Sequence, residues 1–318
     1  MPSELNKEKR EDAMTSGKAR HTIAAAVLCA VAASGCAISE TAQPRTSADG
    51  ANRPEREKAR SVRVGTCNVR FKNAADDKAG NGWDDRKGDL ADLIRRLDMD
   101  IFGMQEVVGV QCDDLRDALA DWEFECGQGA TNPVAYRKSR FRLVDNGVFW
   151  LSETPDVPRS LGWGASNVRC CRWLILEDIA TGRKFCFVNT HLDHRIAKAR
   201  LEGARLILGR MKDFAGGLPV VFVGDFNCDY ESPPSVEVRK AMLDARDVSE
   251  AKDPGPANTF HGWGAIKGVA HNRCDYIYVS EGTRVRGFRT HDDKRPGLDR
   301  WPTDHYLLTA DVEPWACR

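Results

Sequence analysis

From residue 61 onward, apolar and polar positions follow two periods along the chain. Short apolar runs of strand length recur and end in polar residues, whereas longer segments place apolar residues three or four positions apart. The clearest strand is 220–223, a β-branched and aromatic run that Gly224 is expected to end with a sharp turn. The pattern therefore predicts buried strands that alternate with amphipathic helices.

Nine strands and three helices are predicted. The strands are 61–67, 100–104, 133–137, 141–150, 173–177, 184–190, 220–223, 275–279 and 305–312. One helix covers 86–97, a second covers 115–122, and a long third one carries Ala197, Leu201, Ala204, Leu208 and Met211 on one stripe. The segment 80–85 is a polar turn around Trp83, and 230–258 is a variable stretch. No repeat unit is present.

The first 60 residues differ from the rest. Basic residues precede an apolar run at 23–33, which is followed by Ser34, Gly35 and Cys36. Small residues that end in a cysteine resemble a bacterial lipoprotein signal, with a plain secretory signal or a buried helix as the alternatives, and Met14 is an alternative start. We expect a signal peptide at 1–36, a flexible tether at 37–60 and one domain at 61–318. The protein is then exported, either anchored in a membrane by lipid or secreted.

Composition indicates a soluble globular domain. The 318 residues are 42% hydrophobic and 30% charged, with a formal net charge of zero. Removing residues 1–36 takes away five basic and four acidic residues, which leaves a net charge of −1. Proteins that bind long polynucleotides through many phosphate contacts usually have more Lys and Arg than Asp and Glu. The charge therefore argues against that class.

Cysteine is frequent, with 11 residues in the chain. No CxxC pair and no Cys/His spacing typical of zinc occurs. Cys67, Cys186, Cys228 and Cys274 lie in or beside apolar strand-like runs, where a buried thiol is the ordinary interpretation. Cys112 and Cys126 are the pair we expect to form a disulfide, which export permits.

Polar residues that can take part in catalysis or bind metal lie at the termini of predicted strands, some at the start and some at the end. They are Asn68, Glu106, His191, Asp225, Asn227, Asp275, Asp304 and His305. Each alone has a structural explanation, such as an Asx turn, a helix cap or a core histidine. Together they supply oxygen ligands for a hard cation, two imidazoles and a carboxylate partner, as a metal-dependent phosphoryl site requires.

Six segments resemble the ordered motifs of the endonuclease/exonuclease/phosphatase superfamily. They are TCNVR at 66–70, GMQEV at 103–107, NTHLDH at 189–194, VGDFNCD at 223–229, CDYIYV at 274–279 and TDHYLL at 303–308. The match is collinear over about 61–312, and the connecting segments resemble its bacterial subgroup. The resemblance implies an α+β fold, a four-layer αββα sandwich with a cleft along one edge.

The resemblance also implies roles. Glu106, Asn68 and Asp304 would hold or support a divalent cation, Mg²⁺ or Mn²⁺. Asp225 would deprotonate the attacking water, and Asn227 would fix the water or the phosphoryl oxygen. His305, held in its tautomer by Asp275, would contact the phosphate, and His191 would make a second phosphate contact. Arg169 and Asn189 would bind substrate.

Some positions depart from the motifs or keep two interpretations. Arg70 replaces the acid of abasic-site endonucleases, so it favours relatives outside DNA repair. Trp163, Trp263 and Trp301 lie in Gly- or Pro-bearing loops, where they either stack on a base or sugar or pack against the sandwich.

The sequence therefore favours a metal-dependent phosphoesterase, of nuclease, phosphodiesterase or phosphatase type, that acts by direct attack of water. Its partner is a phosphate-ester substrate, namely a small molecule, a nucleotide or a short nucleic acid, and a monomer is expected. The alternative is a surface-anchored binding module on the same fold that has lost catalysis.

Overall fold

The computed structural model describes residues 61–127, 129–251, 254–266 and 273–315. The predicted signal at 1–36 and tether at 37–60 lie outside the described residues. Within the described ranges, no helix combines the length and apolar character that crossing a lipid bilayer needs.

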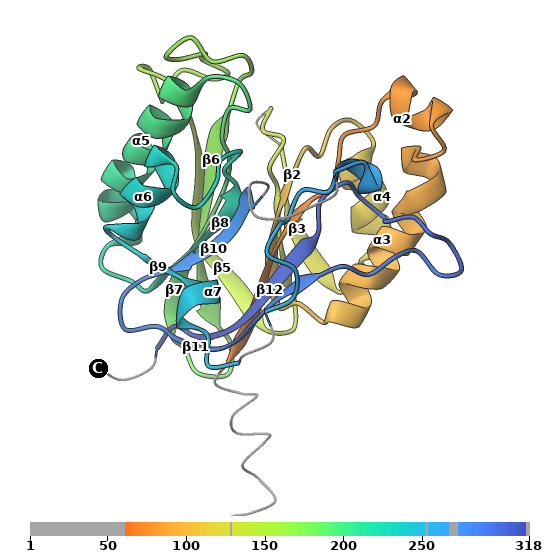
Figure 1. The fold of residues 1–318 in the computed structure, drawn as a ribbon. Helices are drawn as coiled ribbons and strands as arrows, with labels where there is room; N and C mark the ends of the chain where they lie inside the picture. The colour runs from red at the N-terminus through yellow and green to blue at the C-terminus, as the bar shows by residue number, and fades with distance from the viewer. Residues whose placement is uncertain (1–60, 128, 252–253, 267–272, 316–318) are drawn as a thin grey trace, which may run out of the picture. The chain divides into compact units, whose positions relative to one another are not determined.

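The described strands form two six-stranded sheets (Figure 1). The first has the order β11 (Arg284–His291), β12 (Leu307–Glu313), β1 (Val62–Asn68), β2 (Ile101–Gln105), β4 (Val134–Arg137) and β3 (Trp122–Glu125). The second has the order β5 (Phe141–Trp150), β6 (Cys170–Asp178), β7 (Lys184–His191), β8 (Val220–Asp225), β10 (Asp275–Val279) and β9 (Leu243–Asp244).

The two sheets pack face to face, and helices cover their outer faces (Figure 1). Apolar side chains from both sheets, such as Val64 and Phe187, fill the space between them. The main covering helices are α3 (Trp83–Leu97) and α4 (Gln111–Ala118) on the first sheet, and α5 (Ala197–Ala215) and α6 (Pro233–Arg239) on the second. Burying one face of each helix and both faces of each sheet gives four layers. The predicted αββα sandwich is confirmed.

Strand register brings the polar strand ends to one edge. β1 and β2 are parallel neighbours in one sheet, and β7 and β8 are parallel neighbours in the other. In the second sheet His191 and Asp275 both lie opposite Asp225. Gly224 does not end β8 as predicted but lies inside it, at φ 152°, where a Cβ atom would lie 2.1 Å from the carbonyl oxygen of Thr190. Glycine is needed there because the neighbouring backbone approaches closely.

Several element boundaries differ from the predictions. α3 begins at Trp83, inside the predicted turn. The predicted second helix extends to residue 122, but α4 ends at Ala118, and Trp122 already belongs to β3. β11 was not predicted, and the stretch 230–258 holds α6, β9 and α7 (Ala245–Val248). The remaining described elements are α2 (Ala74–Lys78) and the short helix η1 (Gly262–Gly264).

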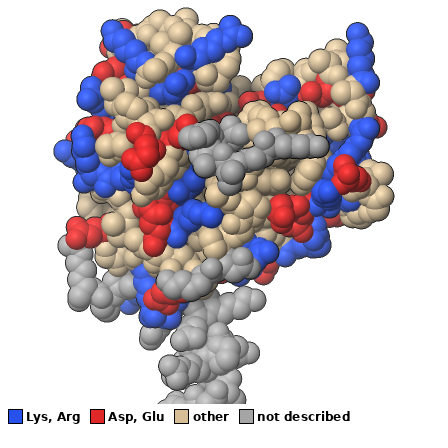
Figure 2. Space-filling model, in the orientation of Figure 1, with Lys and Arg blue, Asp and Glu red and all other residues tan. Residues whose placement is uncertain are grey.

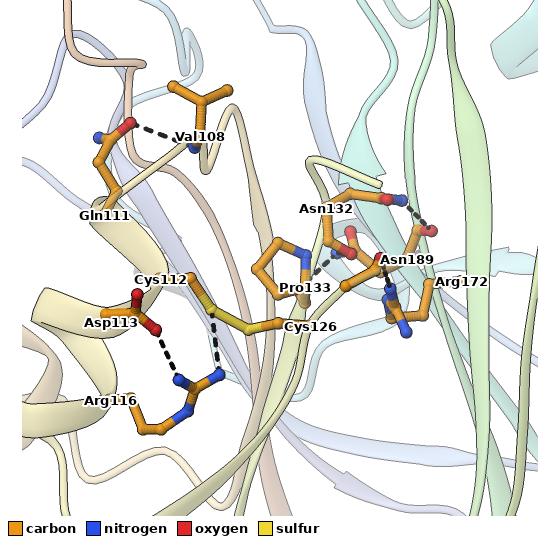
Figure 3. The surroundings of a disulfide bond; sticks show 11 residues. Val108, Gln111, Cys112, Asp113, Arg116, Cys126, Asn132, Pro133, Arg172 and Asn189 are labelled. Atoms are coloured by element: carbon orange, nitrogen blue, oxygen red, sulfur yellow. Dashed lines mark hydrogen bonds and ion pairs between the residues drawn. A yellow bond between two sulfur atoms is a disulfide. The ribbon is translucent and has the colours of Figure 1, made fainter. Parts of the chain in front are cut away.

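The predicted disulfide between Cys112 and Cys126 is confirmed (Figure 3). It joins the first turn of α4 to the residue after β3. Among the other described cysteines, five are buried and free, while Cys274 is only partly buried. This leaves Cys274 as the described free thiol with the most access to solvent.

Candidate active site

A cleft of about 1250 Å³ lies at the edge where the polar strand ends meet. Glu106, His191, Asp225, Asp304 and His305 line it, although they come from both sheets. The side chains of Asn68 and Asp275 lie just beneath, since each is almost fully buried and hydrogen bonded to a lining residue. The sandwich therefore brings these seven predicted residues together.

Asp225 is at the centre of the group. Its Oδ2 accepts a hydrogen bond from Asn68 Nδ2 at 3.0 Å, and its Oδ1 accepts one from the backbone N–H of Asn227 at 2.9 Å. Burial, together with the negative charge of Asp275, raises the pKa of Asp225 to about 7. A carboxyl group with this pKa can accept a proton near neutral pH.

His305 and Asp275 form a buried pair. His305 Nδ1 lies 2.8 Å from Asp275 Oδ2, and His305 Nε2 faces Asp225 Oδ2 at 3.9 Å. Burial lowers the pKa of His305, but the charge of Asp275 and its hydrogen bond outweigh this and hold the pKa well above the ordinary value. The ring is therefore held as an imidazolium, with Nε2 directed toward Asp225.

His191 has the opposite character. Burial, with the positive charges of Arg169 and His305, holds the pKa of His191 well below its ordinary value. Arg169 Nη1 lies 3.0 Å from His191 Nδ1, and the amide of Asn227 lies 2.8 Å from His191 Nε2. A neutral imidazole thus links the predicted substrate-binding Arg169 to Asn227.

A hard cation can bind at the carboxylates of Glu106 and Asp304, next to Asn68. Glu106 accepts hydrogen bonds from Asn68 Nδ2 at 3.3 Å and from the backbone N–H of Phe71 at 3.1 Å. Burial raises the pKa of Asp304, and the charge of Glu106 raises it further. Two carboxylates that repel each other in one cleft form an oxygen donor set that suits Mg²⁺ or Mn²⁺. Asn68 supports Glu106 through Nδ2, since its Oδ1 already accepts from the backbone N–H of Arg70.

A second cluster also has the geometry to bind a metal ion. One ligand atom from each of Asp225, Cys274, Asp275 and His305 lies within 4.8 Å of the others. The cluster shares no residue with the predicted ligands Glu106, Asn68 and Asp304, and it contains sulfur, which Mg²⁺ does not favour.

Three residues of the cleft have backbone conformations that side chains rarely adopt. Arg70, Glu106 and Asn227 have φ angles of 56°, 62° and 50°. Each follows the end of a strand, so the chain turns sharply there and directs the side chain into the cleft. Such conformations persist where the surroundings impose them and are common at functional sites.

Arg86 was missed because a lone arginine on a helix usually faces solvent. In the structure its side chain is fully buried and donates to the carbonyl oxygens of Val69, Arg70 and Pro302 at 2.7, 2.7 and 3.0 Å. It also donates to the carbonyl oxygen of Asn81 at 3.0 Å. Arg86 therefore ties the turn after β1 to the segment that precedes Asp304.

Other predictions need correction. Asn189 does not reach the cleft, because it is fully buried between the sheets, where its amide bonds to backbone carbonyls. None of Trp163, Trp263 and Trp301 lines the cleft. Trp263 packs over Arg86, and Trp301 packs against His261, so packing is the correct interpretation for these two.

Comparisons with known proteins agree with this geometry. A family model described as the Endonuclease/Exonuclease/phosphatase family matches residues 65–305. The chain is 31% identical to a solved Bacteroides thetaiotaomicron structure titled as a mannosyl-6-phosphatase, covering 79% of this chain and 99% of that one, with a TM-score of 0.73. A Bacteroides vulgatus structure titled endonuclease/exonuclease/phosphatase is also 31% identical, with coverage of 80% and 98% and a TM-score of 0.73.

A curated relative is more distant. Nocturnin of Xenopus laevis is 25% identical over 265 residues, which cover 72% of this chain. The chain spans 64% of the length of that relative.

Proposed function

The chain belongs to the endonuclease/exonuclease/phosphatase family, and we propose that it is a metal-dependent hydrolase of phosphoric esters. The observation that carries the proposal is the convergence of Asp225, the His305–Asp275 pair and the Glu106–Asp304 carboxylates on one cleft. These groups supply a base, a cationic donor and an oxygen ligand set, which direct attack of water on a phosphoryl group requires.

Asp225 acts as the base in this proposal. Its pKa of about 7 lets its carboxylate take the proton of a water molecule, while the N–H of Asn227 and the amide of Asn68 hold the carboxylate in place. The Asn227 side chain, which also donates to the carbonyl oxygen of Leu192 at 3.1 Å, borders the same space and orients the water.

Other side chains that line the cleft stabilise the negative charge on the phosphoryl oxygens. His305 donates from Nε2 as an imidazolium that Asp275 holds in orientation. Arg169 and His191 offer a second contact from the second sheet. Preorganised donors aimed at developing charge usually stabilise the transition state of such reactions more than any other single effect.

Glu106 and Asp304 would hold the cation, and Asn68 would support Glu106 through its Nδ2. When bound there, Mg²⁺ or Mn²⁺ supplies positive charge that neutralises the phosphate. Arg70, whose Nη1 lies 3.7 Å from Asp304 Oδ2, adds a fixed positive charge beside this carboxylate.

A phosphomonoester of a sugar is the substrate class that we favour over a phosphodiester. The 31% identical Bacteroides thetaiotaomicron relative that spans the same domain is titled as a mannosyl-6-phosphatase. The cationic groups of Arg70, Arg169 and His305 suit the second negative charge of a monoester. Figure 2 supports a small substrate, because basic and acidic side chains are interspersed over the face shown instead of forming one basic track.

We further propose that the protein acts outside the cytoplasm. Support comes from the sequence alone, through the lipoprotein-like segment that ends at Cys36 and the tether-like composition of 37–60.

The test measures hydrolysis by the purified full chain. Substrates are mannose 6-phosphate, p-nitrophenyl phosphate and bis-p-nitrophenyl phosphate, each with Mg²⁺, Mn²⁺ or a chelator. We expect metal-dependent turnover with the monoesters preferred, and a loss of about 100-fold or more in kcat for Asp225→Asn, since a positioned base contributes 10²–10⁴-fold.

Asp311→Asn is the matched control, because it changes a carboxylate of the same domain that pairs with Arg63 outside the cleft. It should keep the parent rate. Turnover that survives the chelator or is unchanged in Asp225→Asn would contradict the mechanism. Preference for the diester would contradict the substrate class only.

A further inference from the structure

Cys274 brings sulfur to the edge of the catalytic group. Its Sγ lies 3.4 Å from Asp275 Oδ2 and 3.9 Å from His305 Nδ1, and these two atoms are 2.8 Å apart. The second oxygen of Asp275, Oδ1, is buried and has no hydrogen-bond partner in the described structure. The carboxylate of Asp225 lies on the other side of the ring.

These donors match zinc better than magnesium. Zinc is bound by cysteine sulfur, histidine nitrogen and carboxylate oxygen in a tetrahedron, whose edges are roughly 3.4–3.6 Å for the usual bond lengths. The two edges that involve Cys274 Sγ already have nearly this length. The third, between His305 Nδ1 and Asp275 Oδ2, needs to open by roughly half an ångström once the shared proton leaves.

The cluster is reachable from the cleft. Asp225, Cys274 and His305 all line it, so an ion that enters the site meets these side chains. Cys228 offers a comparison, since it lines the same cleft but its thiol contacts Ser235 Oγ at 3.4 Å instead of an imidazole. Proximity to the cleft therefore does not by itself make a cysteine part of a metal cluster.

We propose that Zn²⁺ or Cd²⁺ binds Cys274, Asp275 and His305, with water as the fourth ligand, and that this binding inhibits the hydrolase. The inhibition rests on the proposed function, whereas the binding does not. On binding, the thiol of Cys274 and Nδ1 of His305 each release a proton to solvent, and the metal replaces the proton between His305 and Asp275. No oxidation or reduction occurs. His305 then loses the hydrogen bond to Asp275 that orients its ring toward the phosphoryl group.

Binding is tested by titrating the full chain with Cd²⁺ and following the ultraviolet absorption of cadmium–thiolate bonds. The parent and Cys228→Ala should develop the band, and Cys274→Ser should lose one thiolate equivalent of it. An equal band in Cys274→Ser would overturn the site. Cys274→Ala provides a second variant if the serine variant does not fold, which thermal unfolding reports.

Inhibition is tested by raising buffered free Zn²⁺ at saturating Mg²⁺, with each variant compared with its own zinc-free rate. Half-inhibition of Cys274→Ser should need at least about tenfold more Zn²⁺ than the parent, because even outer-shell partners of a metal site contribute about tenfold or more. Cys228→Ala should match the parent. Equal inhibition of all three would place the zinc effect at the Mg²⁺ ligands and overturn the proposal.

The two readouts separate this proposal from the proposed function. A cadmium band that depends on Cys274 in a chain without phosphoesterase activity would retain the metal site and reject the hydrolase. Hydrolysis without that band would reject the metal site alone.

Discussion

Arg86 is a buried cation whose hydrogen bonds all end on backbone carbonyl oxygens. Burial lowers its pKa to about 10, while the charges of Asp304 and Asp76 counteract this. Its guanidinium lies between the rings of Trp83 and Trp263, at 5.0 and 5.4 Å from their centroids. A planar fork of five donors can serve several carbonyls at once, which lysine cannot do.

We predict that Arg86→Met lowers the free energy of unfolding by at least about 3 kcal/mol, because each buried acceptor that loses its donor costs about 1–3 kcal/mol. Arg96→Met is the control on the same helix, since Arg96 is exposed and pairs with the carboxylate of Asp293 at the surface. It should change stability by about 0.5 kcal/mol or less. Urea unfolding measures both, and similar values would show that the carbonyl contacts contribute little.

Asp193 makes stability depend on pH. Burial raises its pKa, but hydrogen bonds from the backbone of Ile196, Arg195 and Asn167 and from Ser166 outweigh this, so the pKa falls to about 2. Because the folded pKa lies below the unfolded value of about 3.9, the stabilisation is complete above that value and is lost as pH falls toward 2.

Asp193→Asn should therefore cost about 2 kcal/mol near pH 6, and this cost should shrink as the pH falls below 4. Asp213→Asn, which changes an exposed carboxylate on α5, is the control and should show no such dependence. Urea unfolding across this pH range gives the comparison. A cost for Asp193→Asn that stays constant with pH would mean that the charge of Asp193 is not the cause.

Sequence reasoning located the residues at strand ends better than those on helices or inside sheets. Asp225 and His305 could be predicted because ionisable groups of the expected types recur at the termini of several predicted strands, where a rigid sheet can position them. Arg86 could not, because nothing in the helical pattern marks which basic residue turns inward. The family resemblance implies that Asn189 binds substrate, but membership of a motif does not decide on which face of a strand a side chain lies. The Asn189 amide lies between the sheets and bonds to backbone there.

At the level of elements, most strands with apolar runs were predicted within one or two residues, but β6 begins at Cys170, three residues before its predicted start. β11 was missed because its apolar positions are interrupted by Arg284, Arg286, Gly287 and Arg289. Its strand conformation depends on antiparallel pairing with β12, which the sequence pattern does not reveal. α4 and β3 were merged because Leu115, Leu119 and Trp122 continue the helical spacing. Trp122 instead packs edge-on against Phe102 and donates to the carbonyl oxygen of Met99.

The disulfide at the start of α4 stabilises this short helix against the end of β3 (Figure 3). Its cysteines are 14 positions apart, and closing a loop of that size contributes about 3 kcal/mol in the chain-entropy model. We predict that a reducing agent lowers the melting temperature of the parent. The double variant Cys112→Ser with Cys126→Ser should melt at the lower temperature with or without the reducing agent. A parent that does not respond to reduction would contradict this.

For the whole sandwich, the position of the cleft depends on polar contacts across the interface between the sheets. Gly103 of β2 leaves room for the side chain of Asn189 from β7, since a Cβ atom at Gly103 would lie 2.6 Å from that side chain. Asn189 Nδ2 donates to the carbonyl oxygens of Met104 and Pro133 at 2.9 and 3.0 Å, and its Oδ1 accepts from Gln105 Nε2 at 2.8 Å. One amide thus joins strands of both sheets directly below the catalytic residues.

Asn189→Leu tests whether this residue fixes the sheets or binds substrate. Leucine has a similar size but cannot make the amide's hydrogen bonds to the carbonyl oxygens of Met104 and Asn132 and to Gln105 Nε2, so we expect a loss of about 3 kcal/mol of stability. KM should stay close to the parent value at temperatures where the variant is folded, because Asn189 does not line the cleft. Asn146→Leu, at a partly exposed position on β5, should leave stability and KM near the parent values.

A large rise in KM at unchanged stability would instead make Asn189 a substrate ligand, as the family resemblance implies. Burial argues for the structural outcome, since the amide has 0% exposure and its donors already end on backbone oxygens. A substrate could reach the amide only if the sheets separated. In the structural outcome, Asn189→Leu loosens the edge of the sandwich where Glu106 and Asp225 meet, so kcat falls together with stability.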